Sequence, residues 1–177
     1  MPNTYTFITS KTVAAGGSVS IDFTSIPQTF TDLILMLSCR SESGSNADAI
    51  YARFNSSATG YSNLVSYGDT TTYGTFSPSI NYAHFGYGAA TNGSTNTAST
   101  FGNVFVYIPS YKTSNAKTCL VQAGKEAMVG GYQSGINSFQ TARWSGSAAI
   151  SSITLTQEST LDYAEGTTAY LYGIIRS

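Results

Sequence analysis

Hydrophobic and polar residues alternate strictly over residues 18–23, and this period of two predicts a β-strand with one face on a core. Residues 32–39 are instead apolar at both odd and even positions (both parities), which point to opposite faces of a sheet. This pattern predicts a central strand buried on both sides. Residues 49–54 return to alternation, with Tyr51 and Arg53 on the face opposite to the apolar residues. The first third of the chain is therefore expected to be built from strands.

Further segments along the chain are rich in β-branched or aromatic residues and also predict strands. They are residues 79–86, 103–108, 117–123, 137–144, 150–156 and 168–175. No window combines apolar residues at helical spacing with a capping residue, so no helix is expected. Turn-forming residues separate the segments, and the tract 88–99, which lacks large apolar side chains, predicts an exposed loop or hairpin tip.

Many strands, dense turns and no helix predict an all-β fold, an antiparallel β-sandwich that is jelly-roll-like. A chain of 177 residues is long enough to bury roughly 70% of the surface that it exposes when unfolded. One core of that size suffices for the whole chain, so residues 1–177 are expected to form a single β-sandwich domain.

The balance of charges restricts the partners of this domain. Only 10% of the residues are charged, against about 25% in typical soluble domains, and the formal net charge is −1. A chain without a basic field is not expected to bind nucleic acid. No apolar stretch approaches the length of a membrane helix, so no membrane partner is expected. The first residues contain no positive region followed by an apolar run, so no secretory signal is expected.

The two cysteines, Cys39 and Cys119, lie inside apolar strand-like segments, where buried thiols are favoured over a disulfide bridge. Neither cysteine belongs to a metal-ligand pair. Glu42 and Asp48 flank a turn-rich segment and offer at most a weak calcium site, because known calcium loops use more carboxylates at tighter spacing. Neither a metal nor a cofactor is expected.

The residues that catalysis would need are sparse. His84 is the single histidine, and a packed or surface position in its strand is favoured over a catalytic role. No G-x-S-x-G motif provides a serine nucleophile. A glycosidase needs two facing carboxylates, whereas the acidic residues of this chain are spread mostly through turn sequences, where solvated positions are the rule. We therefore expect a protein that is not an enzyme.

Tyrosine is the most distinctive component of the composition, with 13 copies, many of them beside turns rich in Ser, Gly and Asn. Tyrosine suits a recognition surface because it combines contact area with a hydroxyl, but aromatic residues are equally typical of strands and strand ends. A cation next to an aromatic ring could contact a sugar, although a single Trp in a β domain is more often a core residue. The candidate contacts for a partner or a glycan are Tyr67, Tyr73, Tyr87, Tyr132, Arg143 and Trp144.

Stretches at both ends and in the middle of the chain together resemble a known group of proteins. They are residues 26–33 (IPQTFTDL), 101–111 (FGNVFVYIPSY), 150–155 (ISSITL) and 166–174 (GTTAYLYGI). The group consists of small virion proteins, and domains of longer fibre-like proteins, from tailed bacteriophages. These motifs are strand sequences with a Pro or Gly at the boundary, so the resemblance implies a fold more than a task and brings no catalytic residue with it.

The resemblance implies a structural protein made in the host cytoplasm and placed on the outer surface of the virion. One role is a capsid decoration, or cement, protein that binds the major capsid protein or another virion protein and stabilises the shell. The alternative is a tail fibre or spike module that recognises a host surface glycan. The chain lacks coiled-coil heptads and a long shaft, which favours decoration. Residues 169–175 are more apolar than one sheet face needs, so a homo-oligomer, a homotrimer, is expected.

Overall fold

The computed structural model describes residues 5–44, 47–68, 72–86, 91–92, 94, 97–129 and 132–176, and in these ranges the ordered elements are strands. The strands are β1 (Thr6–Thr12), β2 (Ser20–Phe23), β3 (Asp32–Cys39), β4 (Ala47–Asp48), β5 (Ile50–Phe54), β6 (Tyr61–Gly68), β7 (Thr72–Ile80), β8 (Ala83–His84), β9 (Thr91–Asn92), β10 (Gly102–Ile108), β11 (Lys117–Val129), β12 (Tyr132–Trp144), β13 (Ile153–Gln157) and β14 (Thr168–Ile174). The all-β class predicted from the sequence is confirmed.

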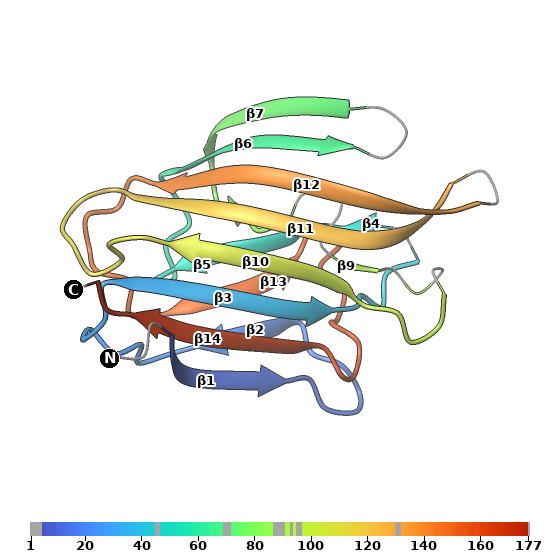
Figure 1. Ribbon diagram of the computed structural model, residues 1–177, viewed down its shortest axis with the longest axis horizontal. Coiled ribbons are helices and arrows are strands. Elements are labelled where there is room, and N and C mark those ends of the chain that lie inside the picture. The colour runs from blue at the N-terminus through green and yellow to red at the C-terminus, as the bar shows by residue number, and fades with distance from the viewer. Residues whose placement is uncertain are drawn as a thin grey trace.

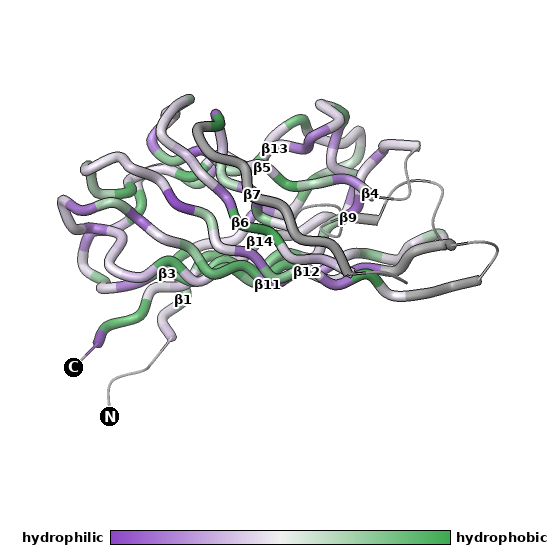
Figure 2. Tube along the Cα trace, turned by 90° about the horizontal axis from the view of Figure 1, so that it is seen from above, coloured by the Kyte–Doolittle hydropathy of each residue, from purple (hydrophilic) through white to green (hydrophobic). Residues whose placement is uncertain are grey.

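Two antiparallel sheets face one another and form a sandwich. The large sheet has eight strands in the order β1-β14-β3-β10-β11-β12-β6-β7, and the small sheet has four in the order β2-β13-β5-β8. Figure 1 shows the large sheet in front, with β2, β5 and β13 behind it. Strands β4 and β9 pair with each other beside the two sheets. Figure 2 shows the two layers from the side, with β5 and β13 in one and β3, β11 and β12 in the other.

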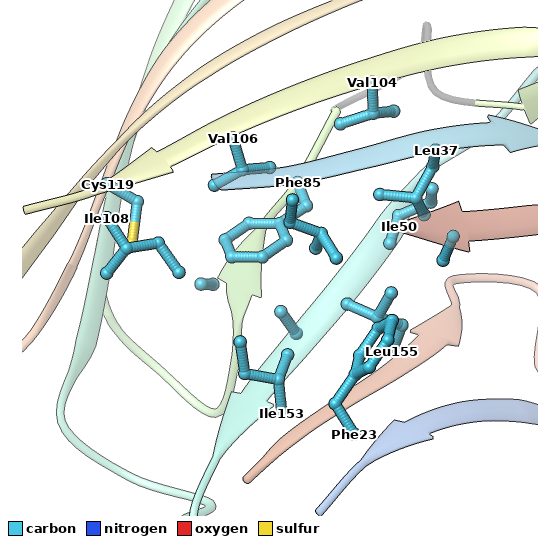
Figure 3. Packing of buried hydrophobic residues seen from close by; sticks show 14 of the residues in the cluster. Phe23, Leu37, Ile50, Phe85, Val104, Val106, Ile108, Cys119, Ile153 and Leu155 are labelled. Carbon is cyan, nitrogen blue, oxygen red and sulfur yellow. The ribbon is translucent and has the colours of Figure 1, made fainter. Parts of the chain in front are cut away.

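The core fills the space between the sheets because the strands alternate in polarity. In β10 the side chains of Val104, Val106 and Ile108 point inward and are buried, while the intervening residues point away. Figure 3 shows these residues of the large sheet opposite Ile153 of the small sheet, with Phe85 between the layers. Each sheet therefore covers the apolar face of the other.

The expectation that β3 is buried on both sides holds for the first half of the strand and was wrong for the second half. Leu33, Leu35 and Leu37 point into the core, as expected for the inward parity. On the outward parity, Met36 is 40% exposed, because the outer side of the large sheet is not covered by a second layer among the described residues. Ile34 at the same parity is only 2% exposed, so the outward side of β3 is buried near its start and becomes a surface at Met36.

Several strand boundaries differ from those expected. The strand predicted over 79–86 is in fact the end of β7, a bend and the two-residue strand β8. Strands β1 and β6 were not predicted, because neither contains a long apolar run. The predicted segments 117–123 and 137–144 are parts of β11 and β12, which are 13 residues each and extend past their neighbours as a long hairpin (Figure 1). Part of the tract 88–99 lies outside the described residues, and Thr97–Ser99 is exposed as predicted.

The end of β14 approaches the rest of the fold closely at Gly173. A Cβ placed on this glycine would come within 2.2 Å of the ring of Phe30, which packs against the core from the segment before β3. Only a residue without a side chain leaves room for that ring. Cys39 and Cys119 are both buried in the core and form no disulfide, so the expectation of buried thiols is confirmed.

Candidate functional site

The outward side of the large sheet is lined by two rows of mostly apolar side chains, which we call the outer face. Strand register places the members of each row side by side across neighbouring strands. The first row is Tyr170, Met36, Phe105, Gln122, Phe139 and Ser66. The second row is Phe7, Tyr172, Ile34, Tyr107, Leu120, Thr141 and Leu64. The two rows form a continuous band from β1 to β6.

Large apolar side chains on this band are open to solvent. Leu64, Leu120 and Phe139 are each between 51% and 56% exposed, and they line a shallow hollow of about 190 Å³. At the other end of the band, Phe7 is 56% exposed and packs edge-on against Tyr172 with ring centroids 5.8 Å apart. Exposed apolar patches of this extent mark sites of interaction in soluble proteins.

Charge is excluded from the centre of the outer face. No residue of its two rows is charged, and Arg143 lies one row further along the strands. A sheet of eight strands about 4.8 Å apart, with seven residues per strand at about 3.3 Å each, presents a face of roughly 900 Å². A standard protein interface uses about 800 Å² on each partner. The whole outward side of the large sheet, of which the two apolar rows are the central part, is thus large enough for one stable protein contact.

At the rim of the outer face, one buried carboxylate ties three segments together. Asp32 is 1% exposed and accepts hydrogen bonds from the Tyr107 hydroxyl at 2.9 Å, the Ser110 backbone N–H at 2.8 Å and the Arg176 guanidinium at 2.8 Å. This carboxylate is a structural anchor that holds β3, the end of β10 and the C-terminal segment in register.

Of the four tyrosines expected as contact residues, Tyr67 and Tyr73 are paired in register across the neighbouring strands β6 and β7. Tyr67 lies near the end of β6 on the inward parity and is half-buried. Tyr73 lies in β7 and Tyr132 begins β12, so both are placed by their backbone only. Tyr87 lies outside the described residues. The contact role of these four tyrosines stays a prediction.

Arg143 and Trp144 were expected to act together, but neighbouring residues of a strand point to opposite faces. Arg143 is exposed on the outward side of β12, whereas Trp144 is only 5% exposed and packs in the core near Phe54, with ring centroids 5.7 Å apart. The cation near this indole is Lys117, whose Nζ lies 5.8 Å from the ring centre. Trp144 therefore has the core position that is more frequent for a single Trp in a β domain, and it does not share a face with Arg143.

The remaining carboxylates with described contacts bind hydroxyl and amide groups of their own fold. Asp48 is buried and accepts hydrogen bonds from the hydroxyls of Ser41 and Ser159, the former at 3.0 Å. Asp22 accepts hydrogen bonds from Ser20 and Thr154, both at 2.6 Å. Within the described ranges no group of three or more His, Cys, Asp or Glu side chains is arranged to hold a metal ion. The absence of catalysis stays a prediction.

His84 lies in β8 at the edge of the small sheet and is 6% exposed, so it is a packed histidine. Its ring stands edge-on to Tyr51 and Tyr82, with centroid distances of 5.0 and 5.3 Å. Burial lowers the pKa of His84 to about 4. The imidazole is consequently neutral at physiological pH and packs as an aromatic ring.

The outer face was missed at the level of sequence because its signal was assigned to the core. Apolar residues at both parities predict burial on two sides for residues 32–39, whereas the same feature of residues 169–175 predicts contacts between copies. The same pattern arises when one side of a sheet packs on a core and the other side is an exposed apolar surface. Leu120 and Phe139 are apolar residues at positions of their strands that the predicted core does not account for. Such residues were the available sequence signal for an exposed apolar face.

No protein-family model matches this chain, and neither the curated proteins nor the solved structures contain a significant match to it. The part of the chain that the structure describes contains no helix able to span a membrane.

Proposed function

We propose that this protein is a structural component of a bacteriophage virion, a decoration protein that attaches to the capsid shell through the outer face of its large sheet. The observation that carries the proposal is the uncharged apolar band over the outer face, with Leu64, Leu120 and Phe139 each more than half exposed. A surface of this kind gains free energy when a partner removes it from water, at about 25 cal/mol for each Å² of apolar area.

The shape and chemistry of the outer face favour a protein partner of similar flatness. The hollows on the outward side of the large sheet are small, with volumes of about 190 Å³ between Leu64 and Phe139 and about 300 Å³ beside Thr118 and Arg143. Sites for small molecules are usually larger and more concave. Regular apolar side chains on a rigid sheet suit a repeated contact with a shell that has many identical subunits.

Composition and resemblance support the virion setting. A charged fraction of 10% leaves a surface that changes little with ionic strength, which suits a particle that meets varied media. Residues 101–111 and 166–174, which resemble phage virion proteins, include β10 and β14 and supply part of the outer face. The alternative role, a tail fibre or spike module that recognises a host glycan, needs a sugar site, whereas Leu64, Leu120 and Phe139, which are each more than half exposed on the outer face, are apolar.

The proposal is tested by adding purified protein to phage heads that were produced without it and measuring bound copies by cosedimentation and particle imaging. We expect saturable binding to the shell at a fixed number of copies. The double variant Leu120→Asp/Phe139→Asp puts two charges on the outer face, and we expect it to bind about a hundred-fold more weakly.

The matched control is Val19→Asp/Leu161→Asp, which changes two side chains that are 64% and 47% exposed and lie away from the outer face. We expect this control to bind the shell like the unaltered protein. Attachment to the shell through the outer face would be refuted if particle images showed the protein at the tail alone. It would also be refuted if both double variants bound the shell equally well.

We further propose that the protein assembles as a homotrimer on the shell. In β14, Ala169 and Leu171 are buried in the core, but Tyr170 is 40% exposed and Ile175, directly after the strand, is 51% exposed. Tyr170 belongs to the outer face, so Ile175 is the side chain of this pair that leaves apolar surface for contacts between copies on the shell. Light scattering at micromolar concentration should give a mass of about 56 kDa, three times the 18.7 kDa of one chain. A mass of one chain across that range would exclude a trimer that forms before the shell is bound.

A further inference from the structure

A second surface feature lies on the small sheet, on the side of the molecule opposite to the outer face. It is a pocket of about 390 Å³, which we call the tyrosine pocket. Its lining residues are Val19, Ser20, Tyr51, Arg53, Tyr82, Thr156, Gln157, Glu158 and Thr160. Its volume is within the range of about 300–1,000 Å³ that is usual for small-molecule sites. Neither the shell contact nor the assembly proposed above uses this pocket.

Strand register explains how the pocket forms. Tyr51 in β5 pairs with Thr156 in β13, and Thr156 pairs with Ser20 in β2, so the three side chains lie in one row on the outward side of the small sheet. The inward neighbours Ile50 and Leu155 belong to the core. A row of hydroxyls from three strands thus forms the floor of the pocket.

Two aromatic rings form the wall of the tyrosine pocket. The rings of Tyr51 and Tyr82 are stacked, with centroids 3.6 Å apart and planes 10° from parallel. His84 supports this pair from the side, with its ring edge-on to both. The pair is held by packing and is ordered before any ligand arrives, so a ligand that packs against it does not have to immobilise it.

Polar groups of both kinds surround the rings. Burial, together with hydrogen bonds to Tyr82 and Glu158, raises the pKa of Tyr51, so its hydroxyl stays protonated. The Arg53 guanidinium offers donors, and its Nε donates to the Asn81 carbonyl at 3.3 Å, which orients the side chain. The Glu158 carboxylate offers acceptors. One cation and one anion cancel, so the lining does not favour a charged ligand of either sign.

We infer that the tyrosine pocket binds a neutral saccharide. A pyranose ring has apolar C–H faces that pack on aromatic rings and a rim of hydroxyls that both donate and accept hydrogen bonds. The stacked Tyr51 and Tyr82 match the first property, and Arg53, Glu158 and the threonine hydroxyls match the second. With Arg53 and Glu158 both in the lining, the pocket has no net charge that favours a charged ligand, and a wholly apolar ligand would leave the charged groups without partners.

The position of the pocket makes the inference compatible with the proposed shell contact. The outer face is on the large sheet, and the tyrosine pocket opens on the other side of the sandwich. A protein attached through its outer face would therefore present the pocket to the surroundings of the particle. Saccharides on a cell surface are the ligands that such an orientation would meet.

The test uses the purified full chain and a panel of neutral saccharides, comprising glucose, galactose, mannose and N-acetylglucosamine as methyl glycosides and as soluble polymers. Saturation-transfer and chemical-shift NMR measure binding. We expect at least one member to bind, with shifts at Tyr51, Tyr82 and Thr156. Replacement of the ring in Tyr82→Ala should weaken binding about ten-fold or more, whereas Tyr82→Phe, which keeps the ring, should bind more nearly like the unaltered protein.

Two controls separate a sugar site from a folding defect. Tyr170→Ala removes an exposed tyrosine from the outer face and should leave saccharide binding unchanged, and Glu158→Gln should weaken binding without removing an aromatic ring. Thermal unfolding confirms that each variant is folded. The inference is overturned if no member of the panel binds, or if Tyr82→Ala, Glu158→Gln and Tyr170→Ala bind alike. The Leu120→Asp/Phe139→Asp protein should still bind saccharide, so the two proposals fail independently.

Discussion

Replacement of Phe85 by Ala should lower the free energy of unfolding by about 3–5 kcal/mol. Phe85 follows the short strand β8, is fully buried and fills the space between the two sheets (Figure 3). Its ring lies 6.0 Å from that of Phe54, and its backbone N–H donates to the Ile50 carbonyl at 2.8 Å. Loss of the ring leaves a cavity between two rigid layers, which cannot close over it without breaking strand pairs.

Urea unfolding followed by tryptophan fluorescence measures this effect, since Trp144 belongs to the same core. The matched control is Phe139→Ala on the outer face, where the ring is 56% exposed. The control removes the same atoms from a site already open to water and should cost less than about 1 kcal/mol. Equal losses for the two variants would contradict the assignment of Phe85 to the core and Phe139 to the surface.

The second large effect is a loss of stability in acid that depends on His84. Burial lowers the pKa of this histidine from 6.5 to about 4. Below pH 6.5 the unfolded chain binds a proton at this side chain, whereas the folded protein does not until the pH approaches 4. Stability therefore falls as the pH falls through this window, by about 2 kcal/mol at pH 5 and about 3 kcal/mol at pH 4. Above pH 7 the imidazole is neutral in both states and contributes no pH dependence.

His84→Phe keeps an aromatic ring between Tyr51 and Tyr82 but removes the titrating group. The measurement is the free energy of unfolding of both proteins at pH 7, 6 and 5, and the informative quantity is the difference between their slopes. We expect the variant to lose about 2 kcal/mol less than the unaltered protein between pH 7 and pH 5. Parallel slopes would show that carboxylates alone govern the acid sensitivity. An overall shift in the stability of the variant does not affect this comparison.

The outer face and the tyrosine pocket differ in how far their shapes depend on packing in the core. The outer face is built from the outward side chains of strands whose inward side chains form the core, as in β10, where Phe105 and Tyr107 alternate with Val104 and Val106. A substitution on the outer face changes a contact without opening a cavity. The tyrosine pocket rests partly on the buried His84, so its shape depends on local packing. Shell-contact variants are consequently expected to be folded more reliably than pocket variants.

The expected contact residues show why a site is harder to predict than a strand. Arg143 and Trp144 are adjacent in sequence, but the side chains of adjacent strand residues point to opposite faces of the sheet. Tyr51 and Tyr82 are far apart in sequence and are stacked in the structure. Their meeting requires that β8 pairs with β5, which places His84 opposite Tyr51. No local pattern specifies this pairing.

The chain by itself determined that the protein is all-β and which residues of most strands point inward, because alternation with a period of two is a local property of an extended chain. In 49–54, for example, the predicted division between buried Ile50 and outward Tyr51 is the observed one. Tertiary structure alone decided which strands are neighbours, since backbone hydrogen bonds are the same for every sequence. That choice aligned Met36 with Phe105 and Tyr170 on an uncovered face and brought Tyr51, Tyr82 and Glu158 to one pocket.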